Sequence, residues 1–320
     1  MAGYIIRRIL QVAPLILAVI VVNFALVHLA PGDPASALAG DNASPEYQEQ
    51  LRVRFGLDKP IVEQLFIYLG KVFSGDLGYS FAYQQPVVNI ILERLPATLM
   101  LMAGSLIPAI VVGTLLGALS AKHRGSWIDR VVSFLTLGLY SVPVFWSGMV
   151  LILIFSLTLG WFPTSGMRNY GEDPSLFGVL HHLFLPALAL SLYTMPTFAR
   201  LTRSAMLDVL EEDFIRTSRA IGHPSRTVYY NHALRNAAMP TITVGGLSIG
   251  EMFSGALLTE TVFAWPGMGQ LMYQAVFQRD YPVLMGTFLI TAVAVAVCMI
   301  IADVLYAVAD PRVRLARKSA

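Results

Sequence analysis

Three groups of residues have types and spacings that could do chemistry. Residues 246–250 read Gly-Leu-Ser-Ile-Gly and match the G-x-S-x-G motif of serine hydrolases, while His181 and His182 form an adjacent pair of metal-ligand types. The hydrolase motif requires a strand, a sharp turn and a helix, whereas this match lies inside an apolar run. A histidine pair without further ligands is too small for a metal site. We therefore expect no catalytic and no metal-binding residue, and an intramembrane serine protease with a base at the same depth stays an alternative.

Glu251 is the third candidate, because it is an acidic residue within an apolar run. A charge at the centre of a bilayer costs about 2.5–3.5 kcal/mol on insertion scales, so such residues usually have a function. Glu251 could face a path through the membrane or form a buried bond with a neighbouring helix, and the sequence leaves both open. The chain has no G-x-x-x-x-G-K-[ST] loop, since Gly70 and Lys71 are followed by Val72. Any ATP chemistry must therefore come from a partner.

The elements that must position these residues are apolar and long. Of 320 residues, 56% are hydrophobic and 13% are charged, which excludes an ordinary water-soluble domain. A helix needs about 20 apolar residues to cross a bilayer core about 30 Å thick. Small residues such as Gly113 and Gly117, spaced as G-x-x-x-G, favour close packing of such helices. We predict an all-α membrane protein with six transmembrane helices, at residues 9–30, 97–121, 131–160, 183–199, 240–263 and 284–308.

The basic residues predict the orientation of the chain. Fifteen of the 22 Lys and Arg residues lie in segments on the same side as the N-terminus. Basic residues resist translocation, so we expect both termini in the cytoplasm. The first apolar run follows a basic start, as in a secretion signal, but it has about 22 residues, longer than a signal core of about 7 to 15. We interpret it as an uncleaved first span. Cys298 is the only cysteine, so no disulfide can form within the chain.

Two segments outside the predicted spans are informative, and the first is too long to be a simple connector. Residues 31–96, on the far side, combine Gly, Pro and Asp turns with amphipathic stretches at 47–55 and 61–73. They predict a small cap of helices and turns, for partner docking or for structural covering.

Residues 200–236 predict a cytoplasmic amphipathic helix that ends at Gly222, because glycine suits a left-handed cap and Pro224 cannot continue the helix. Ser225 is expected to cap a second helix. A solvated connector is the alternative. The predicted apolar face comprises Leu207, Leu210, Phe214, Ser218 and Ile221.

At this point the residues resemble a known family. EDFIRTSRAIG at 212–222 and NHALRNAAMP at 231–240 are similar to the cytoplasmic coupling loop (EAA loop) of ABC-importer permeases, in the dipeptide/oligopeptide/nickel branch. The general motif begins Glu-Ala-Ala six residues before the glycine, where this chain has Arg216, Thr217 and Ser218. Eight further collinear motifs resemble its B-type subunits: HLAPGDP (28–34), FGLDKP (55–60), GDLGYS (75–80), ERLPATL (93–99), TRSAMLDVL (202–210), ETVFAWPGMG (260–269), RDYPV (279–283) and DPRVR (310–314).

The resemblance implies a type I ABC importer permease fold in the bacterial inner membrane, surrounded by lipid and without nucleic acid. Such a permease would form a heterodimer with a second, similar permease subunit. Two ATPase subunits that bind ATP and Mg and a periplasmic solute-binding protein would complete the importer, and this chain would hold no cofactor itself. It would move peptides from periplasm to cytoplasm by alternating access. The implied parts are a cytoplasmic N-terminus with the first span (1–30), a periplasmic cap (31–96), a permease core (97–309) with a coupling loop (200–236), and a cytoplasmic tail (310–320).

The resemblance also implies three groups of site residues. The ATPase-coupling contacts would be Glu212, Phe214, Arg216, Ser218, Arg219, Ala220 and Gly222. The translocation path or gate, including a far-side loop at 261–283, would involve Glu251, Glu260, Trp265, Pro266 and Gly267. Trp265 could instead be an aromatic anchor at the membrane interface. The binding-protein docking residues would be Asp58, Lys59, Asp76, Tyr79, Arg279 and Asp280.

Two alternatives stay open. An ion-coupled secondary transporter could act alone, although intramembrane ionisable groups are sparse and paired broken helices are not apparent. Within the importer class, the cargo could be glutathione, a nickel chelate or a sugar conjugate instead of a peptide.

Overall fold

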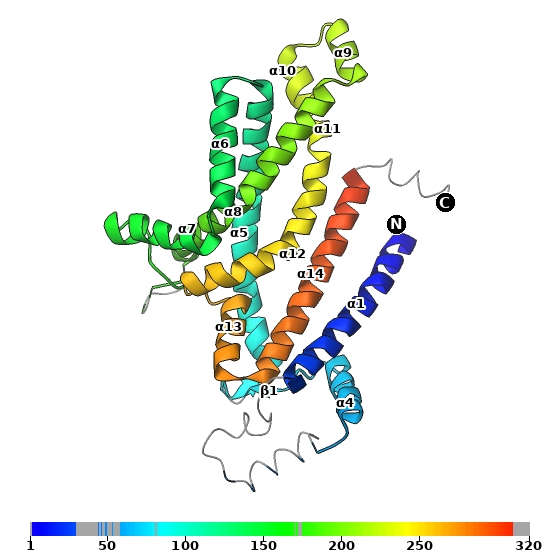
Figure 1. Ribbon diagram of the computed structural model, residues 1–320, viewed down its shortest axis with the longest axis vertical. Helices are drawn as coiled ribbons and strands as arrows, with labels where there is room; N and C mark the ends of the chain where they lie inside the picture. Colours follow the sequence, from blue (N-terminus) through cyan, green and yellow to red (C-terminus); the bar gives the residue numbers. More distant parts are fainter. Residues whose placement is uncertain are drawn as a thin grey trace. The chain divides into compact units, whose positions relative to one another are not determined.

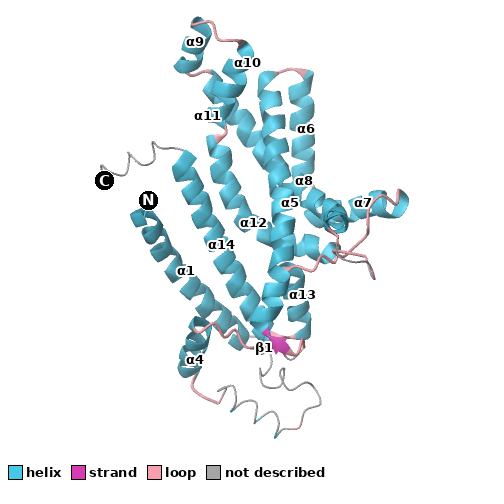
Figure 2. Ribbon diagram, turned by 180° about the vertical axis from the view of Figure 1, so that it is seen from behind, coloured by secondary structure: helices cyan, strands magenta, loops and turns pink. Residues whose placement is uncertain are grey.

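The computed structural model describes residues 2–29, 44, 46, 49, 53, 58–80, 82–169, 171 and 175–309, without the side chains of 2–9, 27, 251, 254, 255 and 302–309. The described part is almost entirely helical (Figures 1 and 2). Strands β1 (Tyr79–Ser80) and β2 (Gln85–Pro86) form an antiparallel pair, with Tyr79 opposite Pro86. The chain divides into two compact units, Met1–Thr98 with Pro266–Ala296 and Leu99–Trp265 with Val297–Ala320, which we call the first and second units.

Helices cover all six apolar runs, but their lengths and breaks differ from the predicted ones. The helices over these runs are α1 (Ala2–Leu29), α5 (Val87–Lys122), α6 (Trp127–Ser141), α7 (Val144–Leu151), the π-helix η1 (Ile152–Thr158), α8 (Leu176–Leu210), α12 (Met239–Val262) and α14 (Tyr281–Ala309). Within the described residues, three helices are long and apolar enough to cross a membrane: Val87–Lys122, Leu176–Leu210 and Tyr281–Ile301. A fourth follows if a bent pair of helices counts as one span. The number six stays a prediction.

The bent pair corrects one predicted span. Residues 131–160 do not form one straight helix, because Trp127–Ser141 and Val144–Thr158 meet at an angle of 101°. Val142 takes an extended conformation with ψ of 127°, and Pro143 precedes the next helix. Proline has no N–H for the helical ladder and disfavours a helical residue before it, so the chain turns here.

The first unit has a core between the first turns of α5, α13 (Met268–Gln278) and the start of α14. Val87, Ile91, Leu271 and Val283 are almost fully buried there. The predicted amphipathic stretch 61–73 coincides with α4 (Ile61–Phe73), which confirms a helix at this position. Its Gln64 bonds His28 of α1 over 2.9 Å. Residues 47–55 lie almost wholly outside the described part. The predicted far-side loop at 261–283 contains a helix of its own, α13.

The second unit depends on a close approach between α5 and α8. A Cβ added to Gly113 would lie 2.7 Å from the carbonyl oxygen of Met195. A Cβ on Gly117 would lie 2.9 Å from Cβ of Thr202, and closer still to the carbonyl oxygen of Ala199. These distances are shorter than ordinary van der Waals contacts, so only glycine lets the two backbones come this near. The predicted G-x-x-x-G packing is confirmed.

Gly117→Ala should destabilise the second unit by about 1 to 3 kcal/mol, because the new methyl group meets a backbone carbonyl that cannot move aside. Gly138→Ala is the matched control, since an added Cβ at this exposed position of α6 has nothing within 4 Å. It should leave stability unchanged or raise it by up to about 1 kcal/mol, because alanine is the better helix former. Chemical unfolding in detergent micelles, followed by circular dichroism, measures both. Equal effects of the two substitutions would contradict the packing described here.

Candidate coupling surface and neighbouring sites

The segment between α8 and α12 folds back onto the ends of the long helices. It contains α9 (Asp213–Ala220), α10 (Ser225–Thr227), the π-helix η2 (Val228–Leu234) and α11 (Arg235–Ala237). Met206 of α8, Ile215 of α9 and Ala233 of η2 have no exposed surface, and Ala121 of α5 joins the same cluster. This buried cluster holds the segment against α5 and α8. The segment is therefore a docked structure rather than a solvated connector.

The predicted amphipathic helix is broken in two. Helix α8 ends at Leu210, and Glu212 takes an extended conformation (ψ 148°) before α9 begins. Three consecutive acidic residues, Glu211 to Asp213, explain the break, because negative charge is unfavourable at a helix C-terminus and favourable at an N-terminus. The break changes which residues face inward. Ile215 is fully buried, whereas Phe214 is 44% exposed and Ile221 is 70% exposed, so the predicted apolar face is wrong at these two positions.

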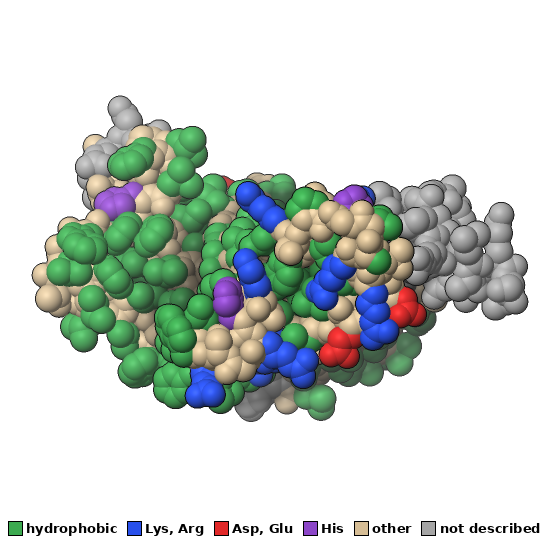
Figure 3. Space-filling model, turned by 90° about the horizontal axis from the view of Figure 1, so that it is seen from above, with side chains coloured by type: hydrophobic (Ala, Val, Ile, Leu, Met, Phe, Trp, Pro, Cys, Tyr) green, Lys and Arg blue, Asp and Glu red, His purple; other side chains and the backbone are tan. Residues whose placement is uncertain are grey.

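The break brings most of the predicted coupling residues onto one exposed surface. Glu212, Phe214, Arg216, Arg219, Ala220 and Gly222 are exposed, and Ser218 is 8% exposed. The Ser218 hydroxyl is buried without a hydrogen-bond partner among the described residues. Viewed from the α9 end, Lys and Arg side chains gather on this face with acidic side chains beside them (Figure 3). We call this exposed set the coupling surface.

Gly222 ends α9 in the predicted left-handed conformation. Its φ is +88°, which side-chain-bearing residues rarely adopt. The amide of His223 donates to the carbonyl of Ser218, and the amide of Gly222 donates to that of Arg219. These bonds close the last turn as in a Schellman-type cap. The predicted cap by Ser225 is wrong, because Pro224 holds the N-cap position of α10 without any side-chain cap.

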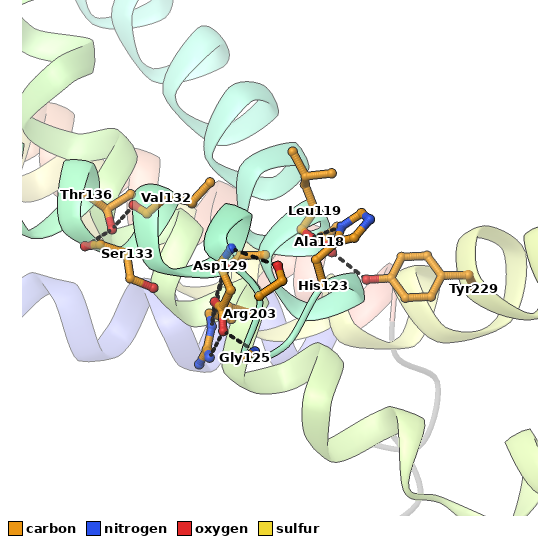
Figure 4. A network of polar contacts seen from close by, with 12 residues as sticks. Ala118, Leu119, His123, Gly125, Asp129, Val132, Ser133, Thr136, Arg203 and Tyr229 are labelled. Atoms are coloured by element: carbon orange, nitrogen blue, oxygen red, sulfur yellow. Dashed lines mark hydrogen bonds and ion pairs between the residues drawn. The ribbon is translucent and has the colours of Figure 1, made fainter.

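An ion pair fastens the helices beneath this segment (Figure 4). Arg203 of α8 donates to both carboxylate oxygens of Asp129, in the first turn of α6, over 2.8 and 2.9 Å. The hydroxyl of Ser120 on α5 and the amide of Gly125 donate to the same carboxylate. Asp129 is only 6% exposed, so three helices and one turn are joined at a buried charge. Such bidentate, charge-assisted bonds are among the stronger ones in proteins.

Sequence reasoning missed this network. In the sequence, Arg203 is only one of the fifteen basic residues that predict the orientation of the chain. A signal was present, since Asp129 is the only acidic residue between Glu93 and Glu172 and lies in a basic turn.

A second polar contact joins η2 to α5. The Tyr229 hydroxyl donates to the carbonyl of Ala118 over 2.5 Å (Figure 4). Burial raises the pKa of Tyr229 to about 12, so the phenol keeps its proton at neutral pH and stays a donor. Helix α5 thus contacts the segment through both a buried apolar side chain and a hydrogen bond.

The predicted path residues divide between the two units. In the second unit, Glu260 and Trp265 have no exposed surface, and the amide of Trp265 donates to the carbonyl of Glu260. Burial inside the protein argues against Trp265 as a lipid-facing anchor. In the first unit, Pro266 is half-buried and Gly267 is buried just before α13. The backbone of Glu251 lies in α12, and its side chain lies outside the description. The role of these five residues in a translocation path stays a prediction.

The predicted docking residues all lie in the first unit, and five of them are exposed. Asp58, Lys59, Asp76, Tyr79 and Arg279 are exposed. The ammonium of Lys59 pairs with Glu63 over 2.7 Å, which raises the pKa of Lys59.

Asp280 differs from these five, because it is 7% exposed. It accepts a hydrogen bond from the Ser80 hydroxyl and another from the Val283 amide, so it stabilises the start of α14.

The histidine pair and the G-x-S-x-G match, the other residues that could do chemistry, have structural explanations. His181 contacts the carbonyl oxygen of Trp161, and His182 that of Gly178. Among the described residues, no group of three or more metal-ligand types lies together. The Gly246–Gly250 match lies inside helix α12, which lacks the strand and sharp turn of a serine hydrolase.

Replacing both members of the buried ion pair tests the network. Asp129→Asn and Arg203→Gln should each lower the free energy of unfolding, because each leaves its partner without a counter-charge. In the double variant the losses should not add, with a coupling energy of about 1 to 3 kcal/mol. Chemical unfolding of the four proteins in detergent gives this cycle. Additive losses would mean that the two side chains act independently.

The chain is similar to known proteins both in sequence and in fold. The model of the family described as binding-protein-dependent transport system inner membrane component matches residues 113–315. The model for the N-terminal region of such membrane components matches residues 1–102. Among solved structures, the methionine ABC transporter MetNI in an inward-facing conformation has a TM-score of 0.58 at 18% identity, over 69% of this chain and 96% of that chain. This likeness shows the fold alone.

Two relatives match along nearly their whole length. The oligopeptide transport system permease protein AppB of Bacillus subtilis (strain 168) is 42% identical, over 98% of this chain and 99% of the relative. The dipeptide transport system permease protein DppB of Escherichia coli (strain K12) is 39% identical, with the same coverage. The chain therefore belongs to the family of binding-protein-dependent transport system inner membrane components.

Proposed function

We propose that this chain is a permease subunit of an ATP-driven importer that carries peptides across the inner membrane into the cytoplasm. The names of two relatives at about 40% identity, one for oligopeptides and one for dipeptides, support this cargo. The permease components of ABC transporters are non-catalytic membrane subunits, and ATP hydrolysis belongs to their partner ATPases. A second permease subunit and a periplasmic solute-binding protein would complete the complex.

The observation that carries the coupling proposal is the two-sided character of α9. Its inner side chain Ile215 is buried with Met206 of α8 and Ala121 of α5, while its outer side chains form the coupling surface. An ATPase that binds the outer face would therefore pull on the long helices through a packed core. We place this face and both chain termini in the cytoplasm, in keeping with the distribution of basic residues.

The proposed mechanism is alternating access. An ATPase pair that is closed with ATP and open without it would bind the coupling surface with different affinities in the two states. That difference in affinity is what shifts the permease between outward-facing and inward-facing forms.

Gly222→Trp should detach the ATPase subunits and abolish uptake, while membrane insertion stays normal. The indole would project from an exposed turn, where an added Cβ has nothing within 4 Å, into the space of the partner. Gly222→Asn is the control for backbone strain, because asparagine tolerates positive φ. Ser218→Ala is the control for position, because Ser218 is on α9 but buried. Co-purification of the ATPases with a tagged permease measures all three. Normal co-purification with Gly222→Trp would refute this contact.

Tyr79→Ala with Arg279→Glu should weaken docking of the solute-binding protein about tenfold, because both side chains are exposed in the first unit. Asp280→Asn is the contrast: it should lower thermal stability and leave docking affinity nearly unchanged, because Asp280 is buried and bonded to Ser80. Surface plasmon resonance on the reconstituted transporter measures the affinity. If Tyr79→Ala with Arg279→Glu leaves the docking affinity unchanged while Asp280→Asn abolishes docking, the proposed docking surface is wrong.

A further inference from the structure

A cavity lies beside the coupling surface, within the second unit. Its volume is about 480 Å³, and its walls come from the ends of α5, α8 and α9, from α10 and from the start of η2. The lining side chains include three cations, Lys122, Arg219 and Arg226, together with Ser225, Tyr229 and Tyr230. None of the described residues that line it is acidic.

The three cations have no ion-pair partner among the described residues, in contrast to Arg124, Arg203 and Arg216. Arg124 pairs with Glu211, and Arg216 pairs with Asp213. Arg203 pairs with Asp129. The cavity therefore concentrates positive charge that nothing in the described protein neutralises. Cations that line one cavity without a counter-charge favour an anion between them.

Parts of the cavity wall are fixed in place. The Tyr229 hydroxyl is bonded to Ala118, and Val228 is in the buried cluster with Ile215. The Lys122 ammonium lies 5.9 Å from the ring centroid of Tyr230, at the outer limit of a cation–π contact. Tyr229 and Val228 are thus positioned by contacts outside the cavity, so this part of the wall does not need a ligand in order to form.

The exposed side chains of α5 and α6 near the cavity fit the level of lipid head groups. Leu115 and Leu119 of α5 are 56% and 41% exposed, as expected for side chains in contact with lipid tails. Lys122 follows within one turn. Trp127 at the start of α6 is 72% exposed, and exposed tryptophans are enriched where tails meet head groups.

We propose that this cavity binds the phosphate of an anionic phospholipid head group. Arg219 and Arg226 have guanidinium groups, which can donate two hydrogen bonds to one phosphate, and Lys122 adds a third charge. A lipid fits better than a carboxylate of the ATPase, because the cavity is concave and adjoins the exposed apolar surface of α5. A bound head group would bridge α5 and α9, so lipid composition would tune how firmly the coupling surface is held.

Titration of the purified full chain in a neutral maltoside detergent tests the site. The probe is dioctanoyl phosphatidylglycerol, with zwitterionic dioctanoyl phosphatidylcholine as the comparison without net charge, and isothermal calorimetry measures binding. The pocket variant is Lys122→Gln with Arg219→Gln and Arg226→Gln. The matched control removes the same charge from exposed positions outside the cavity, by Arg124→Gln, Arg216→Gln and Arg235→Gln.

The pocket variant should bind phosphatidylglycerol at least about tenfold more weakly than the natural chain, and the control should stay within about twofold. Exchange of Arg219 and Arg226 for Lys keeps the charge but loses the paired hydrogen bonds, so the affinity should lie between those of the natural chain and the pocket variant, and the retained binding shows that the fold is intact. If the pocket variant and the control lose the same affinity for phosphatidylglycerol, the lipid is attracted by the positive surface in general and the proposed site is wrong. Equal affinity for phosphatidylcholine would overturn the anionic ligand, and displacement by equimolar inorganic phosphate would overturn the lipid.

Discussion

The close approach of α5 and α8 is the constraint on which the second unit depends. Gly113 and Gly117 let α8 come nearer to α5 than any side chain would allow. That distance fixes the register of the two helices, because one turn further along α5 the hydroxyl of Ser120 meets the Asp129–Arg203 pair. A larger residue at Gly117 would separate the helices and pull this network apart. Small residues inside an apolar bundle thus determine the geometry of polar groups at its end.

The position of the coupling surface depends on this close approach of α5 and α8. Ala121 and Ala118, on the last turns of α5, contact the returning segment through the buried cluster and through the hydroxyl of Tyr229. The segment continues as the π-helix η2, a wider helix that is often found at functional sites. Helix α9 by itself is too short to be stable in water, so its order comes from packing of Ile215. A short helix anchored in this way can transmit displacement without unfolding.

Several features could be predicted because they depend on neighbours in the sequence. The amphipathic pattern of residues 61–73 predicted α4, and Gly222 followed by Pro224 predicted a helix end with positive φ. The candidate coupling residues came from a collinear resemblance. The same local reasoning failed at Glu211–Glu212, where it continued one helix through a break, and at Pro143, where it continued a span through a bend of 101°. At the first place three acidic residues end a helix whose pattern continues, and at the second a proline does.

Composition and local pattern by themselves determined that this is a helical membrane protein and where its apolar runs lie. They did so because hydropathy, proline and glycine act over a few residues. Only the tertiary structure decided that Asp129 is bonded to Arg203, that Ser218 and Asp280 are buried, and that three cations without an ion pair among the described residues share one cavity. Asp129 and Arg203 are 74 residues apart, and such pairings depend on how whole helices pack, which no local pattern specifies.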